Sequence, residues 1–361
     1  MEKLTDICDI QYGYAFDSAC FTEDSSYPPL VRIRDVKRGF SETYYSGEYP
    51  EEYVLHTGDL LVGMDGEFNI ARWKSIDALL NQRVCKLTAK EGTNEEYLRF
   101  AMVKALKAIE DKTAFVTVKH LSAKELNKLE LDIPCIEEQN TRADSLTKLE
   151  KIITLREEEL RQLDDLIKAR FVEMFGDAVD NPMGWEKKQL QDIVTDDCTI
   201  SYGIVQTGDD QDEGVPVFRP VDIVNRTPKL EELKKTTEEI SNKYKRTILK
   251  GREMLITVRA NIADTCIVGE EFKGCNVGRG IVPIRTQEDI MVLEFLKYLM
   301  DSKHLNDDIK SKAKGITLIQ LNMEDLREVE LIIPPVERQK SFVEFARQVD
   351  KSKVVYPLTV F

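Results

Sequence analysis

The stretch from Glu137 to Phe175 reads EEQNTRADSLTKLEKIITLREEELRQLDDLIKARFVEMF and contains neither glycine nor proline. Its apolar residues recur at steps of three and four, and Arg156 and Arg170 fill the two gaps in the series. This spacing predicts one long helix with a narrow apolar seam and charged residues on its other faces. The seam consists of Leu146, Leu149, Ile153, Leu160, Leu163, Ile167 and Met174.

A helix of this length cannot form a compact core of its own. At 1.5 Å per residue it extends over roughly 55 Å. A single apolar seam is buried by pairing with another helix, as in a coiled coil. We therefore expect a spacer helix that pairs with a partner helix and fixes the distance between the parts of the chain on either side.

The sequences that flank the spacer repeat each other, with each matched residue recurring 200 positions later. A repeat of about 200 residues indicates a duplicated domain, because solenoid repeats run roughly 20 to 50 residues. The first copy of the matched set is Thr117, Leu121, Leu126, Leu131, Ile133, Pro134, Glu137 and Gln139. The second copy is Thr317, Leu321, Leu326, Leu331, Ile333, Pro334, Glu337 and Gln339.

The repeat and the spacer together predict an α/β (α+β) fold, with two similar globular domains separated by long coiled-coil-forming helices. The predicted boundaries are 1–134 for the first domain, 135–176 for the spacer helix, 177–334 for the second domain, and 335–361 for a short distal helix and tail.

Several elements of the two domains can be placed from local patterns. We predict a strand over Leu30–Val36, which is rich in β-branched residues, and another over Pro216–Ile223. Ser122 with Glu125 three residues later predicts the start of a short helix. Further strands are expected at 82–87, 253–257 and 281–284, and helices at 95–108 and 292–301.

The bulk composition narrows the class of protein. There is no run of about 18 apolar residues, so no transmembrane helix is expected. The seven cysteines are scattered without a CxxC pair, which favours a reducing cytoplasm over a disulfide framework or a zinc ribbon. The net charge of −14 disfavours nucleic-acid binding, because phosphate binding needs a cationic surface. Binding depends on the local electrostatic potential, however, and many of the acidic residues lie on the spacer helix.

Two motifs resemble the specificity (S) subunit of Type I restriction–modification systems. The ends of the two repeats, IPCIEEQ (Ile133–Gln139) and IPPVERQ (Ile333–Gln339), are similar to that family's entry into its long helices. The stretch RFVEMFGD (Arg170–Asp177), followed by NPMGW (Asn181–Trp185), is similar to the family's junction between the spacer helix and the second domain. The resemblance covers essentially the whole chain.

This resemblance implies a non-enzymatic reader of double-stranded DNA. Each globular domain would be a target recognition domain that reads one half of a split DNA sequence. Methyltransferase (M) subunits that carry S-adenosylmethionine would dock on the helices, and restriction (R) subunits that use ATP and Mg²⁺ would join them. No cofactor would be bound by this chain itself.

The second helix departs from the family pattern because at most 27 residues follow Pro334. In the family this helix is long enough to pair antiparallel with the spacer. We therefore expect part of the spacer seam to be covered by an M subunit or by a second S chain.

The candidate DNA-binding residues are basic side chains of the two domains, because Arg and Lys bind phosphates and base edges. Residues that read bases should differ between the copies, whereas scaffold residues should match; for Arg32 and Arg219, which stand at matched positions, a shared structural role is the alternative. In the first domain the candidates are Arg32, Arg34, Lys37, Arg38, Arg72, Lys74, Arg83 and Lys119. In the second they are Arg219, Arg226, Lys243, Lys245, Arg246, Arg259, Arg279, Lys312 and Lys314.

Two other classes of function are weighed against DNA reading. A coiled-coil scaffold with two protein-binding domains agrees with the acidic charge. A self-contained methyltransferase or nuclease would need a cofactor motif, but Gly274, Gly278 and Gly280 are wrongly spaced for a dinucleotide fingerprint. Metal binding is not predicted either, because none of the histidines has a partner at metal-ligand spacing. These histidines are His56, His120 and His304.

Overall fold

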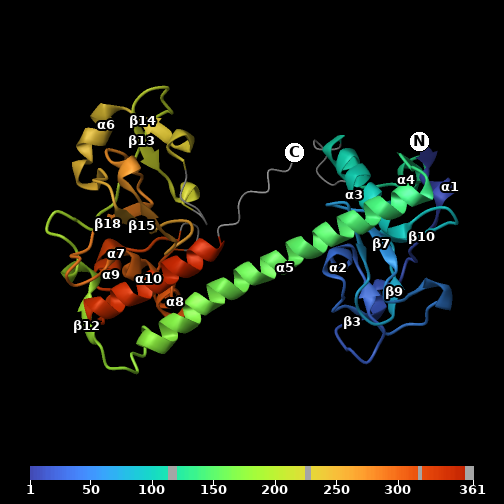
Figure 1. The fold of residues 1–361 in the computed structure, drawn as a ribbon, viewed down its shortest axis with the longest axis horizontal. Coiled ribbons are helices and arrows are strands. Elements are labelled where there is room, and N and C mark those ends of the chain that lie inside the picture. Colours follow the sequence, from blue (N-terminus) through green and yellow to red (C-terminus); the bar gives the residue numbers. More distant parts are fainter. Residues whose placement is uncertain (113–119, 224–228, 316–318, 354–361) are drawn as a thin grey trace. The chain divides into compact units, whose positions relative to one another are not determined.

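The computed structural model describes residues 1–112, 120–223, 229–315 and 319–353. The chain divides into two compact units, Met1–Glu157 and Glu158–Phe361, and each is described by itself (Figure 1). Within the described ranges no helix is both long and apolar enough to cross a membrane.

The predicted spacer is a single helix, α5 (Ile136–Phe175), that continues through the boundary between the two units. Gly176 ends it in the left-handed conformation, with φ +75°. The Gly176 amide donates to the Val172 carbonyl at 2.8 Å. A side chain at this position would also meet the ring of Pro182, so glycine satisfies two constraints at this helix end.

The first unit is built on two small sheets and a few helices. The larger sheet is antiparallel and has the order β2-β10-β7-β8, and the smaller has the order β4-β9-β6 with β4 parallel to β9. The strands are β2 (Cys8–Tyr12), β10 (Val84–Ala89), β7 (Leu60–Gly63), β8 (Asn69–Arg72), β4 (Leu30–Val31), β9 (Ala78–Leu80) and β6 (Val54–Leu55). The helices are α1 (Leu4–Ile7), α2 (Ile33–Arg38), α3 (Glu95–Lys112) and α4 (Ala123–Asn127). Two two-stranded pairs complete it: β1 (Glu2–Lys3) with β11 (Glu130–Leu131), and β3 (Phe21–Thr22) with β5 (Tyr44–Tyr45).

The second unit repeats this plan. Its sheets have the orders β16-β15-β18 and β14-β13-β17, and β13 runs parallel to β17 as β4 does to β9. The strands are β16 (Thr265–Val268), β15 (Glu253–Thr257), β18 (Ile281–Ile284), β14 (Lys234–Thr236), β13 (Val215–Phe218) and β17 (Asn276–Val277). The pair β12 (Glu186–Gln189) with β19 (Glu330–Ile333) matches β1 with β11. The helices are α6 (Glu238–Lys243), α7 (Leu293–Met300), α8 (Lys303–Ser311), α9 (Met323–Arg327) and α10 (Val336–Lys353).

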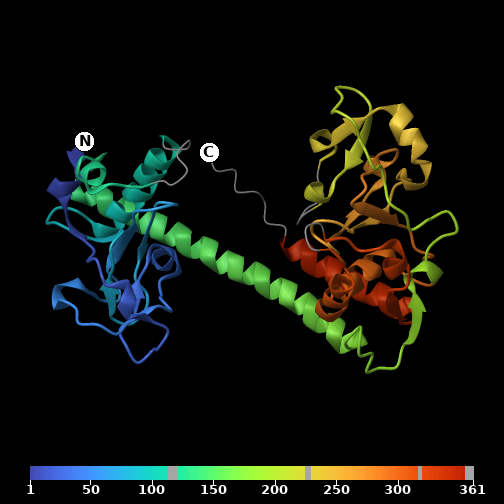
Figure 2. The ribbon, with the colours of Figure 1, turned by 180° about the vertical axis from the view of Figure 1, so that it is seen from behind.

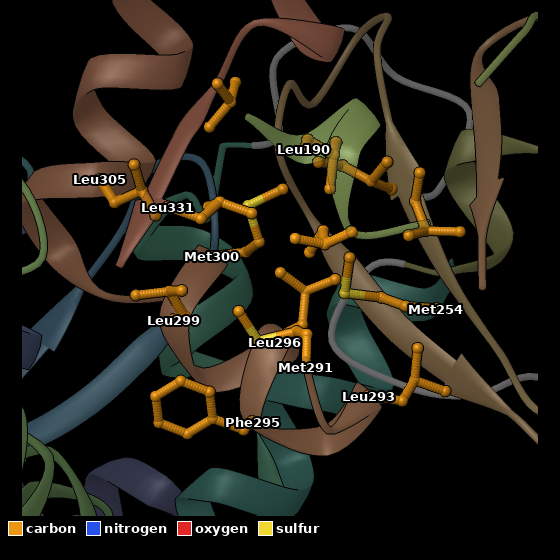
Figure 3. Close-up of a cluster of buried hydrophobic side chains, with 14 of the residues drawn as sticks. Leu190, Met254, Met291, Leu293, Phe295, Leu296, Leu299, Met300, Leu305 and Leu331 are labelled. Carbon is orange, nitrogen blue, oxygen red and sulfur yellow. The ribbon is translucent and has the colours of Figure 1, made fainter. Parts of the chain in front are cut away.

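The core of the second unit gathers apolar side chains from α7, α8 and the strands around them (Figure 3). Phe295, Leu296 and Leu299 of α7 are fully buried. Fully burying each such side chain contributes roughly 1.5–3 kcal/mol, so this helix is held by packing rather than by its own propensity.

Several local predictions are confirmed. The strands over 253–257 and 281–284 have the predicted bounds. The helices over 95–108 and 292–301 are present as α3 and α7. The capping box before α4 is also present, because the Glu125 amide donates to Ser122 Oγ at 3.2 Å while the Ser122 amide donates to Glu125 Oε2 at 2.9 Å.

The strand predicted over Leu30–Val36 is wrong beyond Val31, because the chain turns into α2 there. The buried carboxylate of Asp35 accepts a hydrogen bond from the Arg32 amide at 3.0 Å. That bond caps the N-terminus of α2, so the β-branched residues Ile33 and Val36 lie on a helix rather than on a strand. Strand propensity is weak enough for one such tertiary arrangement to override it.

The matched prediction over Pro216–Ile223 is confirmed as far as Phe218, where β13 ends, and is wrong beyond it for the same reason. After β13 the chain forms a short 3₁₀ turn, η4 (Pro220–Asp222). The Asp222 carboxylate accepts from the Arg219 amide at 2.7 Å. The two copies therefore share this capped turn, in which the backbone amide of Arg32 or Arg219 makes the matched bond.

A buried glutamine fastens the start of α5 to the first unit. Gln139 is 1% exposed. Its side-chain amide donates to the carbonyls of Pro134 at 2.9 Å and Gly92 at 3.1 Å, and its carbonyl accepts from the Asn94 amide at 2.8 Å. One side chain thus satisfies three backbone groups near the N-terminus of α3.

Gln339 makes the same three bonds at the start of α10. It is fully buried. Its amide donates to the carbonyls of Pro334 at 2.8 Å and Ile290 at 2.9 Å, and its carbonyl accepts from the Val292 amide at 2.9 Å, next to α7. The sequence repeat therefore corresponds to a repeated hydrogen-bond network, and we call this pair the anchor glutamines.

Within the second unit, α10 packs along the C-terminal part of α5, as Figure 2 shows from behind. The ring centroid of Phe342 lies 5.5 Å from the centroid of Phe171 and 5.7 Å from the centroid of Phe175. Further along, Lys353 Nζ lies 2.6 Å from Asp164 Oδ1. The helices run antiparallel, because the contact moves backward along α5 as α10 advances.

Replacing an anchor glutamine should destabilise its unit. In Gln339→Leu, three buried backbone groups lose their partners, and each such group costs about 1–3 kcal/mol. We therefore expect the free energy of unfolding of the second unit to fall by at least roughly 3 kcal/mol, as measured by urea denaturation. The control is Gln348→Leu on the exposed side of α10, which should change it by less than about 0.5 kcal/mol. Equal effects of the two variants would contradict the anchoring role.

Candidate nucleic-acid interface

In the first unit, four of the predicted basic residues lie on or beside one short helix. Arg34, Lys37 and Arg38 belong to α2 and Arg32 immediately precedes it, and all four are exposed. Val36 and Asp35 point inward and are buried. We call these four cations, together with Lys74, the α2 patch.

Lys74 joins the patch through the end of α2. Its amide donates to the carbonyl of Gly39 at 3.2 Å, and its side-chain carbons lie about 3.0 Å from where a Cβ of Gly39 would be. Gly39 has φ +76° and terminates α2. Glycine is needed here both for this conformation and for the close approach of Lys74.

The patch contains acids as well as bases. Lys37 Nζ lies 3.2 Å from Glu67, and Arg38 lies 2.7 Å from Glu42 and 3.5 Å from buried Asp35. Its hydrogen bond to Glu42 raises the pKa of Arg38. Among the described residues, no ion pair involves Arg32 or Lys74, so these two cations have the most freedom to bind phosphate.

The Arg72 side chain is engaged in hydrogen bonds within the first unit. Its guanidinium donates to the carboxylates of Glu95 at 2.7 Å and of Glu96, and to the carbonyl of Gly58 at 2.6 Å. Burial alone would lower the pKa of Arg72, but the two carboxylates outweigh burial and raise it. Arg72 therefore ties β8 to the first turn of α3.

Arg83 lies near the connection between β7 and β8. Its Nε is 3.6 Å from Asp65, and its Nη1 is 3.1 Å from a ring nitrogen of His120. His120 is in turn hydrogen-bonded to Asp65. The predicted cation thus belongs to a polar cluster of three residues, Asp65, Arg83 and His120. Lys119, the next prediction along the chain, lies outside the described residues.

In the second unit Arg219 holds its own helix cap. Its Nη2 lies 2.7 Å from Asp222 Oδ1, and this bond raises the pKa of Arg219. Lys243, Lys245 and Arg246 lie at and after the end of α6 and are exposed. Lys243 pairs with Glu239 at 2.9 Å. Arg226 lies outside the described residues.

Arg259 and Arg279 lie close to the turn that follows Arg219. A Cβ on Gly280 would be 2.5 Å from Pro220 Cγ and 3.4 Å from Arg259 Cβ. This glycine therefore allows η4 and Arg259 to approach each other beside exposed Arg279. The Arg259 guanidinium donates to Gln320 Oε1.

Lys312 and Lys314 come from the end of α8 and the segment after it. Lys312 pairs with Asp308 on α8 at 2.8 Å, so its charge is locally balanced. Lys314 exchanges two backbone hydrogen bonds with Gln320, at 2.9 and 3.0 Å. The structure therefore brings Arg259, Arg279, Lys314 and the turn after Arg219 together. The cations at the end of α6 take part in none of these contacts.

The members of the predicted docking seam differ in exposure. Leu149 and Ile153 are 53% and 57% exposed, and Leu146 is also exposed. Leu160, Leu163 and Met174 are half-buried. Ile167 is only 5% exposed and belongs to the core of the second unit, so this chain already covers it.

Several side chains of these clusters were not among the sequence candidates. Asp65 is acidic and Gln320 is uncharged, so neither is among the basic candidates. His120 was considered only as a metal ligand. Tyr202 accepts a hydrogen bond from Gln320. The repeat offered a signal, because His120 and Gln320 directly precede the matched Leu121 and Leu321 but differ from each other.

The described residues contain no group of three or more His, Cys, Asp or Glu side chains placed to hold a metal ion. The cluster around Asp65 and the cluster around Arg259 instead contain hydrogen-bond donors and acceptors that are partly exposed. Such groups suit recognition of a polar surface, including the edges of base pairs.

Comparisons with known proteins agree with this layout. The family model described as the Type I restriction modification DNA specificity domain matches the chain twice, over residues 1–165 and 182–354. The chain is 31% identical over 370 residues to the Type I restriction enzyme EcoBI specificity subunit of Escherichia coli, covering 96% of this chain and 78% of that protein.

Solved structures show the same fold at low sequence identity. The S subunit of a Type I restriction–modification system from M. genitalium has a TM-score of 0.56 at 14% identity, covering 98% of this chain and 89% of that chain. A chain from work on complex assembly and conformational transition of the type I R-M system has a TM-score of 0.54 at 19% identity, covering 97% and 90%.

The predicted resemblance, the predicted fold class and the duplicated layout are thereby confirmed. The family matches span most of the chain, one per repeat, and the chain therefore belongs to the family of Type I restriction–modification DNA specificity subunits, in which it supplies the DNA sequence specificity.

Proposed function

We propose that the two units each read one half of a bipartite DNA target. The observation that carries this proposal is the repeat itself, because the scaffold is duplicated while the exposed polar residues on it differ between copies. Two copies of one fold with different surface chemistry suit two different half-sites on one duplex.

The proposed partners and cofactors are those that membership of this family supports. M subunits, which carry S-adenosylmethionine, dock on the exposed part of the α5 seam, and R subunits with ATP and Mg²⁺ join the complex. A second S chain on the same seam is the alternative occupant. This chain itself binds no cofactor and acts in the cytoplasm.

We propose that the chain performs no catalysis of its own. Burial raises the pKa of Cys8 and Cys85 to about 12, so these thiols stay protonated at neutral pH and are poor nucleophiles. The test is to incubate the purified chain with labelled S-adenosylmethionine and DNA, with and without the M subunit. Transfer of label by the chain alone would overturn the proposal.

A coiled-coil scaffold without a DNA role is the competing function, and the net charge of −14 favours it. A gel-shift of the complex of this chain and the M subunit against a DNA library separates the two. Selection of one split sequence supports DNA reading, and retention of all sequences or of none supports the scaffold.

Loss of the free cations of the α2 patch should weaken DNA binding without changing the sequence preference. In the double variant Arg32→Gln, Lys74→Gln, we expect the slope of log affinity against log salt to fall by about 2, one for each lost phosphate contact. Affinity is measured by fluorescence anisotropy of the complete complex from low to high salt.

The control for this prediction is Lys107→Gln in the same unit. Lys107 lies on α3 and is already paired with Glu110 at 3.5 Å and Asp111 at 3.3 Å. Its loss should leave the salt slope unchanged. An unchanged slope in the double variant as well would place the DNA elsewhere on this unit.

Charging the exposed seam should weaken docking of the M subunit. Leu149→Asp with Ile153→Asp removes two apolar side chains that burial would each favour by roughly 1.5–3 kcal/mol. We expect the affinity for the M subunit to fall by about 100-fold or more in isothermal titration calorimetry. Both side chains are exposed, so the fold of the free chain should remain intact.

A matched variant adds the same charge to the opposite face of α5. Thr147 and Thr154 are exposed and, at about 100° per residue, lie roughly 120° to 140° around the helix from the midpoint of Leu149 and Ile153. Thr147→Asp with Thr154→Asp should therefore bind the M subunit as the unsubstituted chain does. If both pairs of substitutions weakened binding equally, added negative charge rather than the seam would be responsible.

A further inference from the structure

The connection that follows the central strand is matched in the two units. In the first unit, Met64 comes directly after β7; its amide donates to the Arg83 carbonyl at 2.9 Å, and its carbonyl accepts from the Leu121 amide at 2.7 Å. The next residue is Asp65, which forms an isolated β-bridge with His120.

The second unit has the same arrangement. Val258 comes directly after β15; its amide donates to the Gly280 carbonyl at 2.8 Å, and its carbonyl accepts from the Leu321 amide at 3.0 Å. The next residue is Arg259, which forms an isolated β-bridge with Gln320. By backbone hydrogen bonding, Asp65 is therefore equivalent to Arg259, and His120 to Gln320.

The backbone at this position is held in the same conformation in both copies. The following residue has φ +70° at Gly66 and φ +61° at Ala260. For alanine this conformation is strained, and such strain persists where the surrounding structure imposes it, often at functional sites. The backbone bonds therefore hold residues 65 and 259 at matched positions before the hairpin tip.

The side chains at the equivalent positions have opposite charge. Asp65 offers carboxylate oxygens, with His120 bonded to one of them and Arg83 beside the other. Arg259 offers guanidinium donors, and Gln320 orients it while donating to the Tyr202 hydroxyl. The Nε of Arg259 is buried and has no hydrogen-bond partner within the described ranges.

We propose that this matched pair of positions, Asp65 with His120 and Arg259 with Gln320, is the base-reading element of each unit. The inference rests on the proposed reading of a bipartite target. In the second unit, Arg259 donates to the O6 and N7 acceptors of a guanine, the pairing that a guanidinium fork matches. In the first, Asp65 accepts from the N4 amino group of a cytosine.

Several observations favour this element over the other basic residues. Its flanking Leu121 and Leu321 are identical in the two copies and buried, so the scaffold is fixed while the reading side chains vary. Arg219 is equivalent to Arg32 and serves a cap. Arg34, Lys37 and Arg38 lie on a short helix that has only a 3₁₀ turn as its counterpart, and such cations suit phosphate rather than base contacts.

The test determines the preferred sequence of the complete complex with the M subunit from a randomised DNA pool, for the unsubstituted chain and for Arg259→Lys. Lysine keeps the charge but loses the fork. We expect the preference for guanine to fall roughly tenfold or more at one position of one half-site, with overall affinity for the pool changed by less than about threefold.

Two further variants sharpen the assignment. Gln320→Leu should lower the preference at the same base pair as Arg259→Lys, because Gln320 orients Arg259. Asp65→Asn should change one position in the other half-site and leave the first unaltered. The control is Arg347→Gln on α10, whose guanidinium pairs with Glu294 at 2.6 Å and which should change neither half-site.

The outcomes separate the inference from the function on which it rests. If the unsubstituted complex selects a split sequence but Arg259→Lys and Asp65→Asn alter no base, or weaken binding uniformly for all sequences, the base-reading element is elsewhere. If Gln320→Leu and Arg259→Lys affect different base pairs, the pairing of these residues in recognition is wrong. If the unsubstituted complex selects no sequence, the proposed function itself fails.

Discussion

Each long helix begins at a buried carboxamide, and the rest of the structure depends on this connection. A helix that leaves a globular unit through a flexible link would have no defined direction. Gln139 and Gln339 prevent this, because each ties the first turn of its helix to the closing strand and to the start of α3 or α7. A fully satisfied buried polar group of this kind specifies one geometry, since any other leaves its partners without hydrogen bonds.

The two units use this fixed frame differently. α10 lies against the C-terminal part of α5 through the ring cluster of Phe171, Phe175 and Phe342, so that part of the seam is internal. Further toward the N-terminus of α5, Leu149 and Ile153 remain exposed, together with Ile152 and Leu155 beside them. An exposed apolar stripe of this kind is typical of an interaction surface.

Much of this architecture could be predicted from the sequence. The period of the apolar residues predicted α5, and the repeat with its constant offset predicted two similar units, because both signals accumulate over many residues. The turn into α2 could not be predicted, because it depends on where the carboxylate of Asp35 lies in the folded unit.

The residues of the candidate site could be predicted less well from the sequence. Arg72 looked like a surface cation, but its partners Glu95 and Glu96 come from another element of the fold. Asp65 and Gln320 carry no positive charge, so the pattern of basic residues does not point to them. Only the folded backbone shows that Asp65 and Arg259 are equivalent.

The conformation shared by Gly66 and Ala260 bears on how such a chain can diversify. The hairpin tip is held by main-chain bonds from neighbouring strands, and these bonds are indifferent to the side chain that precedes it. A change of residue there leaves the apolar interior untouched. With the base-reading role that we propose for this position, new sequence preferences would arise there by single codon changes while the scaffold is retained.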